Sequence, residues 1–235
     1  MIKRITLAAR RQDLALAPSG PPSGAPSGAP SGAPSGVRPS RIVVCTTLPE
    51  LTGPDPRHGV VVIEWFADAA HLRRFQDWNS PGDRVPPSQV IVAEEAVLRG
   101  ADWLDQRWRD GGDRLKHMAL AVRATGLTPA EFSRAWRSRA GQVRRAGAER
   151  VTAIPDEVLG RAYVQNHPAP AGERVYDAVN EVWFDDLAGL RARVEWFRAN
   201  LSGPAGPGPA DSGPAEADLV RQSWFIAVRE HVVLA

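Results

Sequence analysis

An internal repeat constrains the fold of this chain more than any other feature of its sequence. Trp65 and Trp183, together with the phenylalanine and aspartate that follow each of them, match at a single offset along the chain. Similar strand-like patterns open and close each half. Three matches in the same order predict a tandem duplication of one unit. The matching pairs are Lys3–Arg10 with Lys116–Arg123, Val60–Asp68 with Ala178–Asp186, and Ile91–Leu98 with Ala227–Leu234.

The second half, residues 115–235, has the pattern of a complete unit. Apolar and alternating runs predict four strands, and two segments of helical spacing lie between them. Thr128 can cap the first helix, Pro129 suits its first position, and Glu131 completes a capping box. The expected order is strand-helix-strand-strand-helix-strand. The expected strands are Leu115–Arg123, Arg161–His167, Ala178–Phe184 and Trp224–Leu234, with the second helix after Asp185 and Asp186.

The first half, residues 1–100, departs from this order. Residues 18–38 consist largely of a Pro-Ser-Gly-Ala repeat, and proline and glycine at this density exclude a helix. We therefore expect a degenerate half that lacks its first helix, with the repeat as a disordered linker. Residues 101–114 are expected to connect the two halves. Within them Ala101–Arg109, which contains two tryptophans and a leucine, could form a short helix over the sheet face left uncovered.

Composition excludes several classes of function. The net charge is only +2, and no basic stripe with interleaved aromatic residues indicates a nucleic-acid partner. No stretch approaches the ~20 apolar residues of a membrane span. The single cysteine, Cys45, cannot form an intrachain disulfide, which favours a reducing, cytoplasmic location. The five histidines lack metal-ligand spacing and no phosphate-cradling glycine motif occurs, so we expect neither a metal nor a cofactor.

The second half resembles an EthD domain. The resemblance rests on four stretches: Leu127–Phe132 with Trp136, Tyr163–Pro168, Asn180–Leu187, and Glu230–Leu234. It covers about residues 115–235 and, more faintly, the whole chain. It implies an α+β fold class, in which two ferredoxin-like β-α-β-β-α-β halves form an intramolecular dimeric α+β barrel. The chain is then expected to be a monomer whose halves form a pseudo-dimer, with further association left open.

The resemblance also implies a function. It indicates a cofactor-independent enzyme that oxidises, decarboxylates or rearranges a small hydrophobic molecule of aromatic or polyketide type. One difference from the EthD pattern argues against catalytic activity. EthD domains carry His-Gly-Pro after the tryptophan of the first helix, whereas here Trp136 is followed by Ala140-Gly141-Gln142. The alternative is therefore a non-catalytic ligand-binding or regulatory pseudoenzyme.

His167 and His231 are the candidate catalytic residues. Imidazole titrates near neutrality, so either side chain could transfer a proton. The alternative interpretations are a solvent-exposed histidine at a strand end and a histidine packed at the barrel seam. The first half has Thr47 and Glu95 at the positions that we take to correspond. We therefore expect one ligand site per chain, in the second half.

Six further residues of the second half could contact the substrate. The side chains that could orient a hydroxyl or carbonyl group are Tyr163, Asn166, Tyr176 and Glu230. Trp136 and Trp183 could line the same pocket, or they could pack between helix and sheet. These residues, with the two histidines, are the site expected from the sequence.

Overall fold

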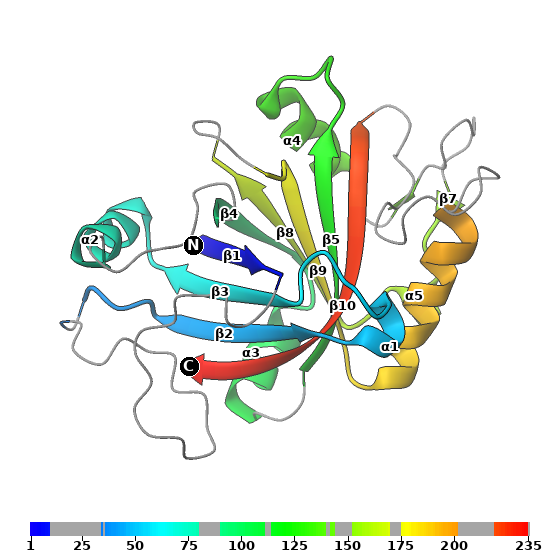
Figure 1. Cartoon of the computed structure of the whole chain (residues 1–235), viewed down its shortest axis with the longest axis horizontal. Coiled ribbons are helices and arrows are strands. Elements are labelled where there is room, and N and C mark those ends of the chain that lie inside the picture. Colours follow the sequence, from blue (N-terminus) through cyan, green and yellow to red (C-terminus); the bar gives the residue numbers. More distant parts are fainter. Residues whose placement is uncertain are drawn as a thin grey trace.

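The structure is a computed structural model that describes residues 1–9, 34, 36–79, 90–110, 114–139, 142–143, 152–169, 175–201 and 219–234. Figure 1 shows the strands gathered at the centre of the molecule, with helices around them. The expected loss of a helix from the first half concerns residues 10–33, which lie outside the described ranges. Within those ranges, no helix has the length and apolar character needed to cross a membrane.

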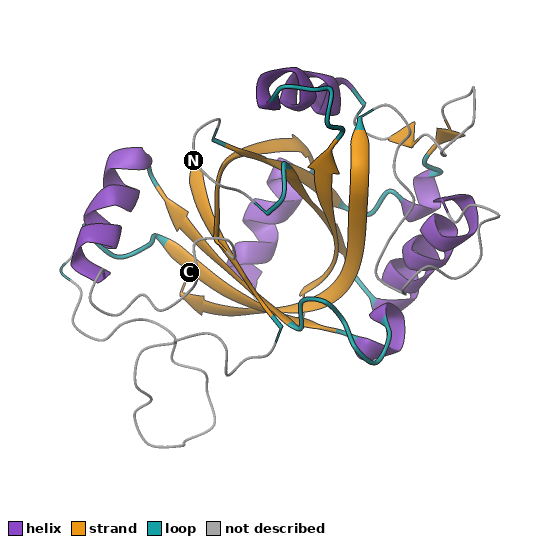
Figure 2. Ribbon diagram, turned by 45° about the horizontal axis from the view of Figure 1, so that its top comes forward, coloured by secondary structure: helices purple, strands orange, loops and turns teal. Residues whose placement is uncertain are grey.

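Eight antiparallel strands close into one barrel, which Figure 2 views from an oblique angle. Each strand has two hydrogen-bonded neighbours, so closure leaves none of these strands with an unpaired edge. A separate two-stranded ribbon pairs β6 (Gln142–Val143) with β7 (Thr152–Ala153). In order around the barrel, the strands are β1 (Ile2–Ala8), β3 (Val60–Phe66), β2 (Arg41–Thr47), β10 (Val220–Leu234), β5 (Arg114–Arg123), β9 (Ala178–Phe184), β8 (Ala162–Pro168) and β4 (Val90–Arg99).

The predicted fold class is wrong. We expected an α+β fold of two ferredoxin-like halves, each with its own four-stranded sheet, facing each other as a dimeric α+β barrel. The structure is instead mostly sheet with few helices, and its strands form a single closed β-barrel. Pairing of β2 with β10, and of β4 with β8, joins the two halves through backbone hydrogen bonds. The sequence pattern could not show this closure, because alternation reports which faces are buried and not which strand edges pair.

Each half contributes four strands to the barrel in the same spatial order. The order is β4-β1-β3-β2 for the first half and β10-β5-β9-β8 for the second. The strand registers also correct one correspondence that we drew from the sequence. Lys3 pairs with Ala93 as Lys116 pairs with Val228. The position equivalent to Glu95 is therefore that of Glu230, one residue before His231.

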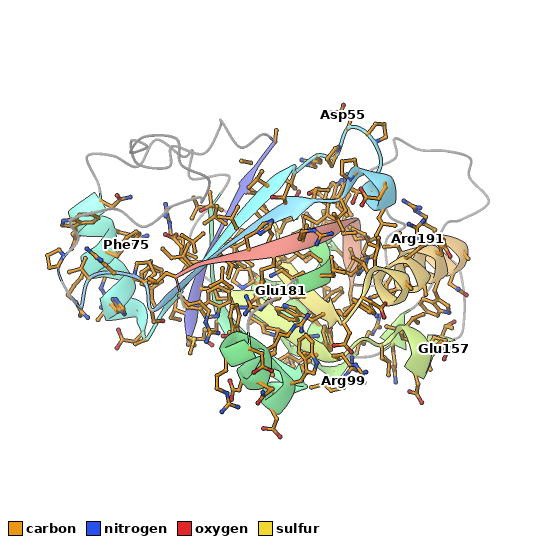
Figure 3. All side chains as sticks on the ribbon, turned by 90° about the horizontal axis from the view of Figure 1, so that it is seen from below. Asp55, Phe75, Arg99, Glu157, Glu181 and Arg191 are labelled. Atoms are coloured by element: carbon orange, nitrogen blue, oxygen red, sulfur yellow. The ribbon has the colours of Figure 1, made fainter. Side chains whose placement is uncertain are left out.

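The barrel interior is filled by alternate side chains of every strand, and a cluster of buried charges lies among them. Lys3 Nζ is 2.6 Å from Glu181 Oε1 and 3.1 Å from Glu95 Oε1. Lys116 Nζ is 2.6 Å from both Glu181 Oε2 and Glu230 Oε2. Glu181, labelled in Figure 3, therefore bridges the two lysines. We call these five residues the interior ion cluster. The apolar core around them includes Ile5, Val43, Ile63, Met118, Leu120 and Ile226.

The helices of the second half form as the sequence predicts. α4 (Pro129–Ser138) begins with the expected capping box, in which Glu131 N donates to Thr128 Oγ1 at 3.3 Å and Thr128 N donates to Glu131 Oε2 at 2.8 Å. α5 (Leu187–Leu201) packs against β5 and β9. The first half has α1 (Pro49–Thr52) and α2 (Ala69–Asn79), and a 3₁₀ turn at Asp156–Val158 precedes β8.

The connector forms the expected helix, α3 (Ala101–Asp110), but not over the outer sheet face of the first half. In Figure 2 this helix lies behind the ring of strands. Leu104 packs with Val164 and Trp183, and the Trp108 ring meets Trp65 with 5.7 Å between ring centroids. These contacts are with residues of the barrel interior, so α3 covers one end of the barrel.

Candidate ligand-binding site

A pocket lies on the outer face of the second half of the barrel, between α4 and α5. Side chains of β5, β8, β9 and β10 line it, together with Arg99 of β4. It offers about 70 Å³ to the centres of water-sized molecules, several times what one buried water requires. Ala119 of β5 leaves space in the lining, and Trp136, Phe197 and Phe225 supply aromatic walls. The pocket therefore suits a small, flat molecule.

His117 contributes an unused hydrogen-bond donor to this lining. Its side chain is only 2% exposed, and its ring packs against Phe197 and Phe225 with 5.2 Å between centroids in each case. Nδ1 accepts a hydrogen bond from Arg193 Nε at 3.2 Å, which leaves the proton of the neutral ring on Nε2. Among the described residues Nε2 has no partner. Burial, and then the charge of Arg193, lowers the pKa of His117 well below its usual range, so the ring is neutral at pH 7.

Arg193 and Arg99 are two of the three arginines that bring positive charge to this lining, the third being Arg139. Arg193 of α5 is buried, and its Nη1 donates to the Val158 carbonyl oxygen at 2.7 Å. Arg99 donates through Nη2 to the carbonyl oxygens of Leu159 and Gly160. Burial lowers the pKa of Arg193 to about 9, which still leaves it protonated at neutral pH. Arg193 and Arg99 are thus fixed by neutral backbone acceptors beside the pocket.

A chain of side-chain hydrogen bonds positions the Tyr163 hydroxyl. Its oxygen accepts from Gln165 Nε2 at 2.8 Å and from Asn180 Nδ2 at 3.0 Å. Trp136 Nε1 in turn donates to Asn180 Oδ1 at 3.0 Å. All four residues line the pocket. Tyr163 and Trp136, which we expected from the sequence to contact substrate, therefore do lie at a common site.

His167 lies next to this chain but is not part of the pocket lining. Its Nδ1 is 2.9 Å from Ser133 Oγ, and its Nε2 is 3.2 Å from Gln165 Oε1. Burial, followed by the charge of Arg137, lowers the pKa of His167 to about 4. Its geometry is that of a residue that positions Gln165. By strand register its counterpart in the first half is Thr46, one residue before the expected Thr47.

Three other expected site residues point into the barrel instead of the pocket. Asn166 Nδ2 donates to Glu181 Oε1 at 3.0 Å, and Glu230 belongs to the interior ion cluster. Lys116 Nζ lies 4.9 Å from the centroid of the Trp183 ring. These side chains stabilise the interior and are separated from the pocket by the sheet itself.

The last two expected residues lie at opposite extremes of exposure. Tyr176 is fully buried in the barrel interior, where its hydroxyl is 2.7 Å from His58 Nε2. His231 is exposed on β10. Neither lines the pocket.

Sequence reasoning missed His117 and Arg193, although both leave a signal. Alternation along Leu115–Arg123 places His117 and Ala119 on the strand face opposite Lys116. Arg193 stands four residues before Phe197 in a helix whose other inward positions are apolar. An arginine at such a helix position, facing a histidine on a strand that it covers, is the pattern that could have identified the pocket.

Comparison with protein-family models, with curated proteins and with solved structures gives no significant match. The EthD resemblance thus rests only on the sequence stretches that suggested it. Within the described ranges, no group of three or more histidine, cysteine, aspartate or glutamate side chains is arranged to hold a metal ion.

The buried histidines predict a loss of stability in mild acid. Burial lowers the pKa of His58 and His167 to about 4, and it lowers that of His117 well below its usual range. Unfolded histidines titrate near about 6.5, so between about pH 6.5 and pH 4 the unfolded state binds more protons. The free energy of unfolding should fall as pH drops through this window, by up to about 1.4 kcal/mol per pH unit for each histidine. Urea unfolding at several pH values measures this, and a flat profile would contradict it.

Proposed function

We propose that this protein is a cofactor-independent enzyme that acts on a small aromatic molecule in the pocket between α4 and α5. The observation that supports this most is the neutral, buried His117, which lines a pocket with aromatic walls and whose Nε2 has no partner among the described residues. A largely apolar pocket with a few fixed polar groups is the usual form of a small-molecule site. Phe197 and Trp136 suit a flat ligand, and the fixed Tyr163 hydroxyl suits a ligand oxygen.

His117 would act on negative charge that develops at a substrate oxygen. When a polyketide-type β-keto acid is decarboxylated, the bond to the departing carbon dioxide breaks, its electron pair moves onto the ketone oxygen as an enolate, and a proton from solvent then takes the place of the lost group. A neutral imidazole N–H in a water-poor pocket stabilises such an oxygen without ionising itself. Arg193, by donating to Nδ1, keeps the proton of the neutral ring on Nε2.

Ligand binding without turnover is a second candidate function. No aspartate or glutamate occurs among the residues that line the pocket, so the described part of the chain offers no carboxylate base there. The residue at the position of the EthD histidine is Ala140. A molecule that binds in the pocket and is recovered unchanged would favour this function over the first.

A large side chain placed in the pocket should prevent the ligand from binding. Ala119→Phe places a large ring in the lining from β5. Small aromatic molecules that copurify with the wild-type protein, identified by mass spectrometry, should be absent from this variant. The recovered molecule is then incubated with wild-type protein in the presence of a metal chelator, and its conversion is followed by chromatography.

Thr46→Phe is the matched control, because it adds the same ring at an exposed strand position in the first half. It should retain the ligand. Equal ligand content in the two phenylalanine variants, both folded by circular dichroism, would place the ligand elsewhere and refute the proposed site.

A further inference from the structure

Arg193 is a buried cation that the described part of the chain leaves without a compensating carboxylate. Its side chain is 6% exposed, and its two hydrogen-bond partners, His117 Nδ1 and the Val158 carbonyl oxygen, are both neutral. The buried lysines differ from Arg193 in having charged partners, since Lys3 and Lys116 each contact two carboxylates of the interior ion cluster. An uncompensated buried charge is strongly unfavourable. A counter-charge supplied by a ligand would remove that penalty.

Arg99 adds a second positive charge beside the first. Burial has the largest effect on the pKa of Arg193, Tyr163 raises it, and the charge of Arg99 lowers it, so the two guanidinium groups are close enough to repel. The charge of Asp156 raises the pKa of Arg99, although the two side chains are too far apart to form an ion pair. The hydrogen bonds from Arg99 to Leu159 and Gly160 hold its head group in place. The lining therefore contains the fixed cations Arg193 and Arg99, a third arginine, Arg139, and His117.

The surroundings favour a carboxylate over a phosphate as the counter-charge. Each arginine uses two of its five N–H groups in hydrogen bonds within the protein, and the remaining donors of each planar fork can hold a planar anion in two-pronged fashion. Phosphate sites commonly add a helix N-terminus or a glycine-rich loop. The residues that line this pocket include none from the first turn of α4 or α5. A singly charged, planar group matches guanidinium donors and the aromatic walls.

We infer that the pocket binds an aromatic carboxylate, with the carboxylate group at Arg193 and Arg99 and the ring against Phe197 and Trp136. This inference rests on the proposed function, because it names the class of molecule that the same pocket takes. It predicts that charge, and not only aromatic surface, determines affinity.

Salicylate and salicylamide provide the test, because they differ in charge and hardly in size. Titration calorimetry with the full-length chain should show that salicylate binds roughly 10-fold or more tightly than salicylamide, as expected for charge-assisted hydrogen bonds. Arg193→Met and Arg99→Met should each bring this ratio close to one. Arg191→Met is the matched control, because Arg191 is an exposed residue of the same helix, which Figure 3 shows well apart from Arg99. It should leave the ratio unchanged.

Three results would overturn the inference, and they differ in whether they also count against the proposed site. Equal binding of both probes to the wild-type protein would show that charge plays no part, while the aromatic site would stand. Binding of neither probe would count against the proposed site as well. Arg99 is only half-buried, so Arg99→Met tests the inference even if Arg193→Met fails to fold. An unchanged salicylate preference in folded Arg99→Met and Arg193→Met would also contradict it.

Discussion

Glu181→Gln should destabilise the protein by about 3–5 kcal/mol, the usual cost of removing one partner from a buried ion pair. Glu181 is fully buried and is the carboxylate that contacts both Lys3 and Lys116, each at 2.6 Å. Although burial raises its pKa, the charges of Lys116 and Lys3 lower it to about 2, so Glu181 is ionised throughout the neutral range. The amide keeps the shape of the side chain but removes the negative charge that the two lysines share, which leaves Lys3 with only Glu95 and Lys116 with only Glu230 as charged partners.

The matched control for this substitution is Asp185→Asn. Asp185 pairs with Arg161 at 2.5 Å, but both side chains are largely exposed. Such surface pairs contribute about 0–1 kcal/mol. Denaturant unfolding at pH 7 should therefore separate the two amide variants by several kcal/mol. Similar midpoints for Glu181→Gln and Asp185→Asn would show that the interior ion cluster does not hold the barrel together.

His117→Leu should lower kcat on the copurified substrate by about 10²–10³-fold, the effect of removing one donor to a developing oxyanion. KM should change little, because the aromatic walls and arginines that bind the ground state remain. A leucine of similar size removes the unpartnered Nε2 but also leaves the buried Arg193 Nε without its acceptor, so kcat must be compared per folded molecule. A purely structural role would instead lower stability and leave kcat per folded molecule unchanged.

His231→Leu is the control for this prediction. His231 lies exposed on β10 and does not line the pocket. Its replacement should leave kcat within about twofold of wild type, whereas a proton-transfer role would cost about 10²-fold or more. If His231→Leu loses activity and His117→Leu does not, the assignment of the site to the outer pocket is wrong.

Local structure could be predicted from the sequence because its signals are local. The capping box at Thr128 and Glu131 forms, and the repeated apolar runs become strands at the same relative positions in each half. Closure of the barrel was missed because it depends on pairing between distant strands. Residues Val228–Leu234 pair with β2 of the other half, and nothing in their alternation specifies that partner.

The site was only partly predicted for a related reason. Strands that are buried on both faces do not reveal which side chains point inward. Glu230 and Asn166 were therefore expected to meet substrate, whereas they lie within the barrel and contact Lys116 and Glu181. Tyr163, on the opposite face of β8 from Asn166, does line the pocket. Face assignment required the three-dimensional structure.

A crystal structure of the protein with salicylate is the most direct test of the ligand site. We expect density for one salicylate per chain between α4 and α5. Its carboxylate should lie within hydrogen-bond distance of Arg193 or Arg99, and its ring should lie against Phe197. Salicylate bound within the barrel interior, or on the outer face of the first half, would contradict the account.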